Sequence, residues 1–173
     1  MALAVAGGGL LMSAPFRPAQ AAIPRPSPRA IAFENMHTGE RLELTYWRDG
    51  AALPDAMRRI DHLFRDHRAN AVHGIAPQLI DLLHDLRMAL DSRAPLQIIS
   101  GYRSPGTNAS LAKASAGVAT GSLHMRGMAV DIRLPGCDMA AVRDAAIALG
   151  RGGVGFYPRS DFVHVDIGRV RRW

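Results

Sequence analysis

Alternating apolar and polar positions predict β-strands in both halves of the chain. Residues 30–34 and 41–47 alternate on either side of Thr38-Gly39, which is typical of a β-hairpin. Short apolar runs rich in β-branched residues predict further strands at 96–99, 128–134, 152–157 and 162–167. We expect these strands to form a small antiparallel sheet.

Apolar residues at helical spacing predict helices between the strands. Segments 54–67 and 77–90 each place apolar residues every three or four positions and carry a proline near the start. A shorter helix is predicted at 108–115, and Asp138 is suited to cap a helix that ends at Gly150. Because helices and strands mix without a βαβ rhythm, the pattern predicts an α+β fold in which helices flank the sheet.

The first residues have the pattern of an export signal. Residues 1–12 are an almost unbroken apolar run, and Ala19-Gln20-Ala21 has the small residues of a cleavage site. The run is shorter than the roughly 20 residues that a membrane-spanning helix needs, so we expect no stable membrane span. No positive charge precedes the run, so we expect the true start to lie upstream of Met1. A floppy Ala/Gly tail is the alternative.

A proline-rich segment separates this start from the rest. Prolines occupy every second position from Pro24 to Pro28, which indicates an extended linker. We therefore divide the chain into residues 1–28, a signal-peptide remnant and linker, and residues 29–173, a single folded domain. The length of 173 residues and the hydrophobic content of 48% fit one such domain, and we expect a monomer.

Charge and cysteine content narrow the function only slightly. The net charge of +6 comes almost wholly from arginine and favours an anionic partner such as peptidoglycan, phospholipid or nucleic acid. We expect no nucleic-acid partner, because the arginines are scattered, no aromatic stacking platform accompanies them and the start resembles an export signal. The single cysteine, Cys137, cannot form an internal disulfide and is expected to be a small buried apolar group.

Two histidines lie in patterns that suit a metal site. His124 and Asp131 flank a glycine hinge that leads into a strand, so both side chains can face one cleft. Strand alternation then puts His164 and Asp166 on the same face of a second strand. Two histidines and a carboxylate with an open fourth position are the usual form of a catalytic zinc site.

A simpler interpretation of the same residues stays open. His124 and Asp131 can form an ordinary hydrogen-bonded pair, and Asp166 can cap a turn or pair with an arginine. The other five histidines lie in helical or turn contexts without a repeating ligand spacing, and we expect them to be surface or helix-face residues: His37, His62, His67, His73 and His84.

Three motifs resemble one known family. Ser100-Gly101-Tyr102-Arg103-Ser104, the segment from Ser122 to Asp131, and Gly152 to Pro158 followed by Phe162 to Asp166 resemble the murein endopeptidase K family. That family is a branch of the zinc D-Ala-D-Ala peptidase superfamily, whose fold is shared with the Hedgehog signalling domain. The resemblance implies this fold, a periplasmic enzyme commonly exported by the twin-arginine route, and hydrolysis of peptide crosslinks in peptidoglycan.

The resemblance also implies roles for single residues. His124, Asp131 and His164 match the ligands of a zinc ion, and Arg103 matches an arginine that steadies the developing oxyanion. Asp161 stands where the wider superfamily has a glutamate that acts as general base. An aspartate is one methylene shorter, so Asp166 is a rival for that role. A catalytically impaired peptidoglycan-binding module of the same fold is the alternative function.

Overall fold

The computed structural model describes residues 28–114 and 118–173. The expected signal peptide and almost all of the proline-rich linker lie outside the described residues. No helix of the described part is long and apolar enough to cross a lipid bilayer.

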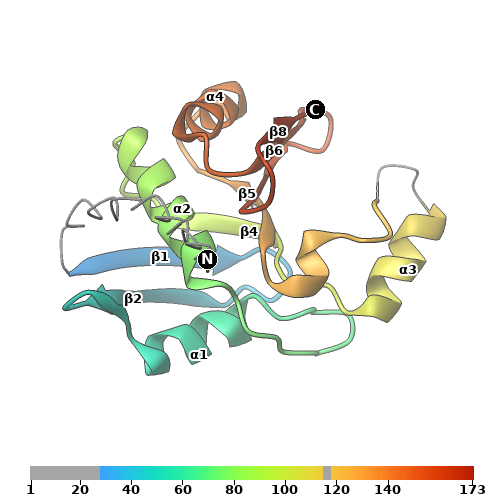
Figure 1. The fold of residues 1–173 in the computed structure, drawn as a ribbon, viewed down its shortest axis with the longest axis horizontal. Helices are drawn as coiled ribbons and strands as arrows, with labels where there is room; N and C mark the ends of the chain where they lie inside the picture. Colours follow the sequence, from blue (N-terminus) through green and yellow to red (C-terminus); the bar gives the residue numbers. More distant parts are fainter. Residues whose placement is uncertain (1–27, 115–117) are drawn as a thin grey trace, which may run out of the picture.

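The described chain is built around one mixed sheet of eight strands, in the order β3-β2-β1-β4-β5-β7-β6-β8 (Figure 1). The predicted hairpin is present as the antiparallel pair β1 and β2. However, β1 runs parallel to β4, and β6 runs parallel to β8. The strand bounds are β1 Arg29–Asn35, β2 Arg41–Arg48, β3 Ala51–Ala52, β4 Leu96–Ser100, β5 Ala129–Arg133, β6 Gly153–Tyr157, β7 Phe162–Asp166 and β8 Arg171–Arg172.

The α+β class is confirmed, whereas the prediction of a small antiparallel sheet is wrong. The parallel pairing of β1 with β4 is hidden in the sequence because a hairpin and two helices lie between these strands. Such a long connection is what a parallel pair requires. Strand β8 is also hidden, because two arginines alone have no apolar alternation.

Four α-helices in residues 28–114 and 118–173 accompany the sheet, and three of them begin at a proline. Asp138 caps the fourth as predicted by accepting from the Ala140 N–H at 2.9 Å, and this helix ends at Gly150 with φ +61°. The predicted helix 54–67 ends four residues early, because the Asp66 carboxylate takes the backbone N–H groups of Arg68 and Ala69 into a turn. The helix bounds are α1 Pro54–Leu63, α2 Pro77–Ala89, α3 Pro105–Ala114 and α4 Met139–Leu149.

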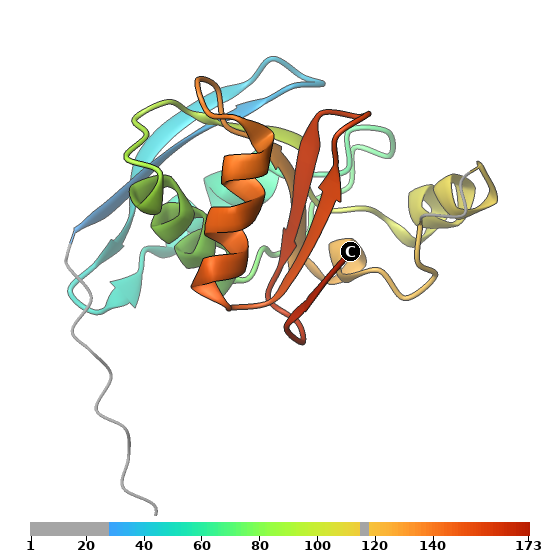
Figure 2. The same ribbon diagram turned by 90° about the horizontal axis from the view of Figure 1, so that it is seen from above.

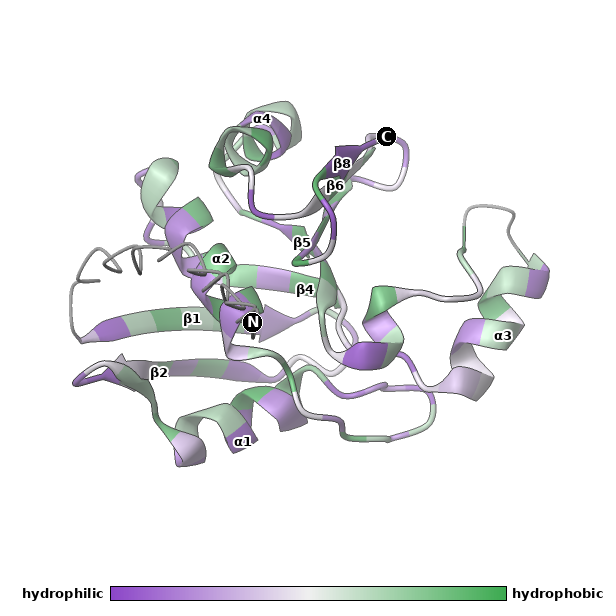
Figure 3. Cartoon of the chain, viewed as in Figure 1, coloured by the Kyte–Doolittle hydropathy of each residue, from purple (hydrophilic) through white to green (hydrophobic). Residues whose placement is uncertain are grey.

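The hydrophobic core leaves one face of the central strands for polar residues. Helices α2 and α4 lie side by side on the sheet, and α3 projects away from it (Figure 2). Hydrophobic stretches recur along β1, β4 and β5, with hydrophilic residues at the strand ends (Figure 3). On β5 and β7 the core side chains are fully buried Val130, Ile132, Val163 and Val165. Because side chains alternate along a strand, Asp131 and His164 lie on the opposite face from this core.

Candidate metal centre

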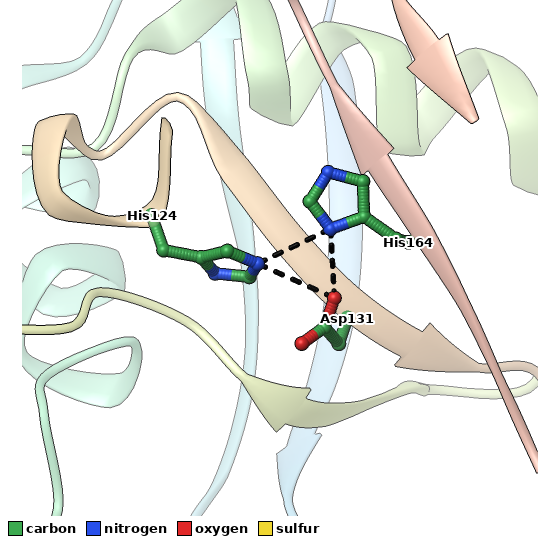
Figure 4. A group of neighbouring side chains, drawn as sticks. All are labelled: His124, Asp131 and His164. Atoms are coloured by element: carbon green, nitrogen blue, oxygen red, sulfur yellow. Dashed lines mark hydrogen bonds and ion pairs between the residues drawn. The ribbon is translucent and has the colours of Figure 1, made fainter. Parts of the chain in front are cut away.

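Three residues from separate elements meet on that polar face. Asp131 and His164 are direct partners in the antiparallel pair β5 and β7. His124 comes from a short 3₁₀ helix, η1 (Leu123–Arg126), which leads into β5. The side chains of all three point toward one another (Figure 4). The structure thus brings together the three residues that the sequence singled out as metal ligands.

The potential ligand atoms are close enough to share one ion. Nε2 of His124 lies 3.2 Å from Nδ1 of His164, and Oδ1 of Asp131 lies 3.3 Å and 2.8 Å from these two nitrogens. All three residues are buried. Among the described residues they form the one group of three or more histidine, cysteine, aspartate or glutamate side chains compact enough to hold a metal ion.

The orientation of both imidazole rings favours a cation between them. Nδ1 of His124 donates to the backbone oxygen of Gly101 at 2.7 Å, so Nε2 of a neutral His124 carries a lone pair that faces Nδ1 of His164. His164 lies between two carboxylates, with Nδ1 2.8 Å from Asp131 and Nε2 3.1 Å from Asp166. A proton or a metal ion beside Nδ1 of His164 satisfies both the lone pair of His124 and the carboxylate of Asp131. The residues present therefore fit a divalent metal, and outer hydrogen bonds that fix the tautomer are typical of histidine ligands.

Electrostatics hold Asp131 in its charged form. Burial alone would raise the pKa of this carboxyl, but the charges and hydrogen bonds of His124 and His164 lower it well below its usual range. Burial would lower the pKa of His164, but its hydrogen bonds to Asp131 and Asp166 outweigh burial and raise it. The site therefore contains a negatively charged carboxylate, which favours binding of a cation beside the two histidines.

Glycine and a helix cap fix the position of His124. Ser122 caps η1 by accepting from the backbone N–H of His124. Gly127 ends η1 with φ +63°, and a β-carbon there would lie only 2.1 Å from the backbone oxygen of Gly74. Any other residue at position 127 would therefore be strained in its backbone and would also collide with this neighbouring loop.

Arg103 contacts the same centre from a loop after β4. Its Nη2 donates to Oδ2 of Asp131 at 2.5 Å, and its Nε donates to Ser100 at 2.9 Å. The loop is tied to η1 in both directions, because His124 donates to Gly101 and accepts the backbone N–H of Arg103. Arg103 also lines the cleft over the three candidate ligands, where its role in catalysis stays a prediction.

The structure turns Asp161 away from these residues. Asp161 has a left-handed backbone, with φ +53°, and its carboxylate pairs with Nε of Arg133 at 3.0 Å. It lines a different surface hollow, beside Arg133 and Pro158. In this geometry Asp161 has no contact with the candidate metal centre among the described residues.

Asp166 is enclosed and supports His164 from behind. Its side chain is fully buried, accepts from the N–H groups of Gly153 and Gly168, and receives two hydrogen bonds from Arg171 at 2.7 and 3.1 Å. Burial would raise its pKa, but the hydrogen bonds from His164 and Arg171 hold that pKa well below its usual range. The aspartate therefore orients a histidine and, in this arrangement, has no free oxygen for a substrate.

The three candidate ligands line a cleft of about 300 Å³. Its walls include the candidate ligands, both Arg103 and Arg171, and several aromatic and hydroxyl side chains. Two of the aromatic residues, Tyr157 and Trp173, belong to β6 and to the segment after β8.

Comparison with known proteins identifies the family of this chain. The profile of the peptidoglycan L,D-endopeptidase MepK family matches residues 24–173. The chain belongs to this family.

Individual relatives agree over nearly the whole length. The chain is 40% identical to the peptidoglycan L,D-endopeptidase MepK of Escherichia coli K12 over 168 residues, which cover 96% of this chain and 92% of the relative. The protein of the same name from Shigella flexneri gives the same values. A probable peptidoglycan L,D-endopeptidase MepK from Haemophilus influenzae is 40% identical over 154 residues, which cover 88% and 83% of the two chains. The family expected from the sequence motifs is confirmed.

Several residues around the centre were not assigned a role from the sequence. Asp66 fixes the loop of Arg103 by accepting the backbone N–H of Ser104 at 2.9 Å, and Arg171 holds Asp166. The signal that could have found Asp66 is an aspartate at a helix end, where such side chains commonly bind backbone N–H groups.

Proposed function

We propose that the chain is a zinc-dependent endopeptidase that hydrolyses peptide crosslinks in peptidoglycan, with His124, Asp131 and His164 as the metal ligands. The observation that carries the proposal is that three potential ligand atoms converge within 4.8 Å in a cleft of a peptidoglycan endopeptidase family member. Peptidases of this family are metal-dependent. Zinc fits because two imidazoles and one carboxylate are typical ligands of catalytic zinc, although other first-row metals bind the same ligands.

The bound metal would supply a Lewis acid that activates water and polarises the carbonyl of the scissile bond. The chain contributes the shape and charge around that bond. Arg103 uses Nη2 and Nε to hold Asp131 and Ser100, while its Nη1 has no partner among the described residues. Its remaining N–H groups can stabilise negative charge on the tetrahedral oxygen.

On the opposite side of the centre, two successive contacts hold His164 in place. Arg171 fixes Asp166, and Asp166 fixes the ring of His164, so that Nδ1 faces Asp131. Such support keeps a ligand in the geometry that the metal requires. We therefore assign Asp166 a positioning role and leave the general base unassigned.

We propose the L,D bond as the bond that is cut. The relatives are named L,D-endopeptidases. Of two crosslink types in peptidoglycan, D-Ala to diaminopimelate and diaminopimelate to diaminopimelate, only the second has its carbonyl on an L centre. A peptidoglycan substrate also implies a periplasmic enzyme, and the net charge of +6 favours a polymer with free carboxylates.

The alternative function, a module that binds peptidoglycan without cutting it, is favoured by one observation. Asp161 is paired with Arg133 and Asp166 is enclosed, so neither offers the cleft a free carboxylate. Under this alternative the chain binds metal and muropeptides but releases no product.

The test is digestion of purified muropeptide dimers of both crosslink types, with product monomers measured by mass spectrometry. We expect zinc-restored activity after chelation, restricted to the diaminopimelate-to-diaminopimelate dimer. His124→Ala should lose both bound metal and activity, while His62→Ala, at an exposed position of α1, serves as the matched control. Metal-loaded protein that binds either dimer but cleaves neither would establish the binding module instead.

A further inference from the structure

The end of the chain forms part of the cleft wall. The backbone of Trp173 extends the pairing of β8 with β6, because its N–H donates to Val154 and its oxygen accepts from Phe156 at 3.2 and 3.0 Å. The position of this residue is therefore fixed by the sheet. The residue nevertheless stays 51% exposed, and it lines the cleft over the candidate metal centre.

The indole of Trp173 packs against Gly155, a glycine next to the candidate ligand His164. A β-carbon on Gly155 would lie 2.7 Å from the indole ring, so only glycine leaves room for it. Gly155 is the direct partner of His164 in the β6 and β7 pair, and the rings of Trp173 and His164 are 5.3 Å apart. The guanidinium of Arg171 lies over the indole at 4.9 Å. The glycine in the motif before Tyr157 thus serves the placement of Trp173.

This indole holds the hydroxyl of Tyr157 in a defined orientation. Nε1 of Trp173 donates to Oη of Tyr157 at 2.8 Å, and the tyrosine ring stacks on Phe162 at 4.6 Å. Because an indole N–H only donates, the tyrosine oxygen is the acceptor and keeps its own hydrogen to donate. No acceptor for that hydrogen is found among the described residues, and Tyr157 lines the cleft.

The position of Tyr157 suits binding rather than bond cleavage. Gly155 and Tyr157 are two residues apart on β6, so they share a face and lie about 7 Å from each other along the strand. About two residues of an extended peptide span this distance. A peptide whose reacting carbonyl lies at His164 would therefore reach Tyr157 with a neighbouring part of its backbone or a stem carboxylate.

We propose that the hydroxyl of Tyr157 donates a hydrogen bond to an oxygen of the substrate peptide, and that Trp173 is the positioning residue that orients it. The inference rests on the proposed function, because it takes a peptidoglycan stem peptide as the ligand. It adds a contact to the substrate about two residues away from the reacting bond.

The first test is Tyr157→Phe, which keeps the ring stacked on Phe162 and removes only the hydroxyl. Loss of one neutral hydrogen bond should raise KM about three- to tenfold, with kcat within about twofold of wild type. An unchanged KM overturns the proposal. A fall in kcat at unchanged KM also overturns it, because the hydroxyl would then act on the transition state.

The second test addresses the positioning role of Trp173. Trp173→Phe keeps an aromatic wall and removes the indole N–H, so KM should rise, and Tyr157→Phe should add little in this background. Trp47→Phe is the matched control and should leave KM unchanged, because Trp47 lies on β2, near the opposite edge of the sheet. Independent, additive effects of the two changes at Tyr157 and Trp173 would refute the positioning role.

A binding measurement separates this inference from the proposed function. The protein has two tryptophans, so Trp47→Phe leaves Trp173 as the only fluorescent indole. Adding a monomeric muropeptide to this chelator-treated variant should change its fluorescence, and Tyr157→Phe should weaken the apparent affinity three- to tenfold. No fluorescence change at saturating muropeptide refutes the inference. If the protein gives the expected fluorescence titration but cleaves neither muropeptide dimer, the proposed function is refuted and the inference stands.

Discussion

Asp66 offers a quantitative test of how the cleft is held together. Its side chain is 2% exposed and accepts backbone N–H groups from both sides, from Arg68 at 3.0 Å and from Ser104 at 2.9 Å. Ser104 directly follows Arg103. The change Asp66→Asn preserves the size of the side chain but replaces one acceptor oxygen by a donor nitrogen.

The magnitude follows from the pKa of Asp66. Burial would raise this pKa, but the hydrogen bonds from Thr107 and Ser104 outweigh it and lower the pKa from 3.8 to about 2. A difference of nearly two units makes ionised Asp66 worth about 2 kcal/mol of stability at pH 7. The amide nitrogen of asparagine would also face a backbone N–H, which adds about 1–2 kcal/mol for an unsatisfied donor. We expect a total loss of about 3–4 kcal/mol.

The assay is urea denaturation of the metal-free protein at pH 7, 5 and 3. A lowered pKa means that the contribution is complete above about pH 4 and is lost as the pH falls through 2. The stability difference between wild type and Asp66→Asn should therefore shrink by about 1 kcal/mol between pH 7 and pH 3. Asp91→Asn, at an exposed turn position with φ +46°, is the control and should change stability by less than about 0.5 kcal/mol.

Two results would refute this reasoning. One is a loss below about 1 kcal/mol at pH 7, which would mean that the backbone N–H groups find other partners. The other is a difference that does not change between pH 7 and pH 3, which would mean that ionisation of Asp66 is not what stabilises the loop.

Further predictions concern the cleft itself. Arg103→Ala should fold normally and lose on the order of a hundredfold in kcat/KM, because one oxyanion donor and the clamp on Asp131 are removed; an alanine variant with wild-type kinetics would rule out both roles. Asp161→Asn should keep activity within about twofold, because its carboxylate pairs with Arg133, and a loss comparable to that of Arg103→Ala would restore it as the base. Asp166→Asn should instead lower metal affinity about 10- to 100-fold, measured by competition with a chelating dye, and unchanged affinity would contradict its support of His164. Gly155→Ala should displace the exposed indole of Trp173, seen as altered fluorescence of the unliganded protein with raised KM, whereas an unaltered spectrum would place the indole elsewhere.

Local patterns predicted much of the fold because local forces determine those parts. Helix α4 was expected with its cap at Asp138 and its end at Gly150, and both are present. The alternation on β7 correctly put His164 and Asp166 on one face. The parallel pairing of β1 with β4 was missed, because strand order depends on contacts between residues more than 60 positions apart.

The candidate site shows the same division. Sequence motifs singled out His124, Asp131 and His164, and the structure brings them together, although their role as ligands stays a prediction. The directions of Asp161 and Asp166 could not be predicted. The first depends on a left-handed turn residue and an arginine on another strand, and the second on an arginine contributed by the last strand.

The two oxygens of Asp131 have separate tasks, and this division bears on which cations the site selects. Arg103 binds Oδ2, whereas Oδ1 faces the two imidazole nitrogens and is the oxygen placed to bind a cation. Calcium prefers six to eight oxygen ligands and often takes both oxygens of a carboxylate. A pocket that offers two imidazole nitrogens and one oxygen discriminates against calcium and magnesium by ligand type and by ligand number. We therefore expect Arg103, by binding Oδ2 of Asp131, to favour first-row transition metals over calcium at the candidate site.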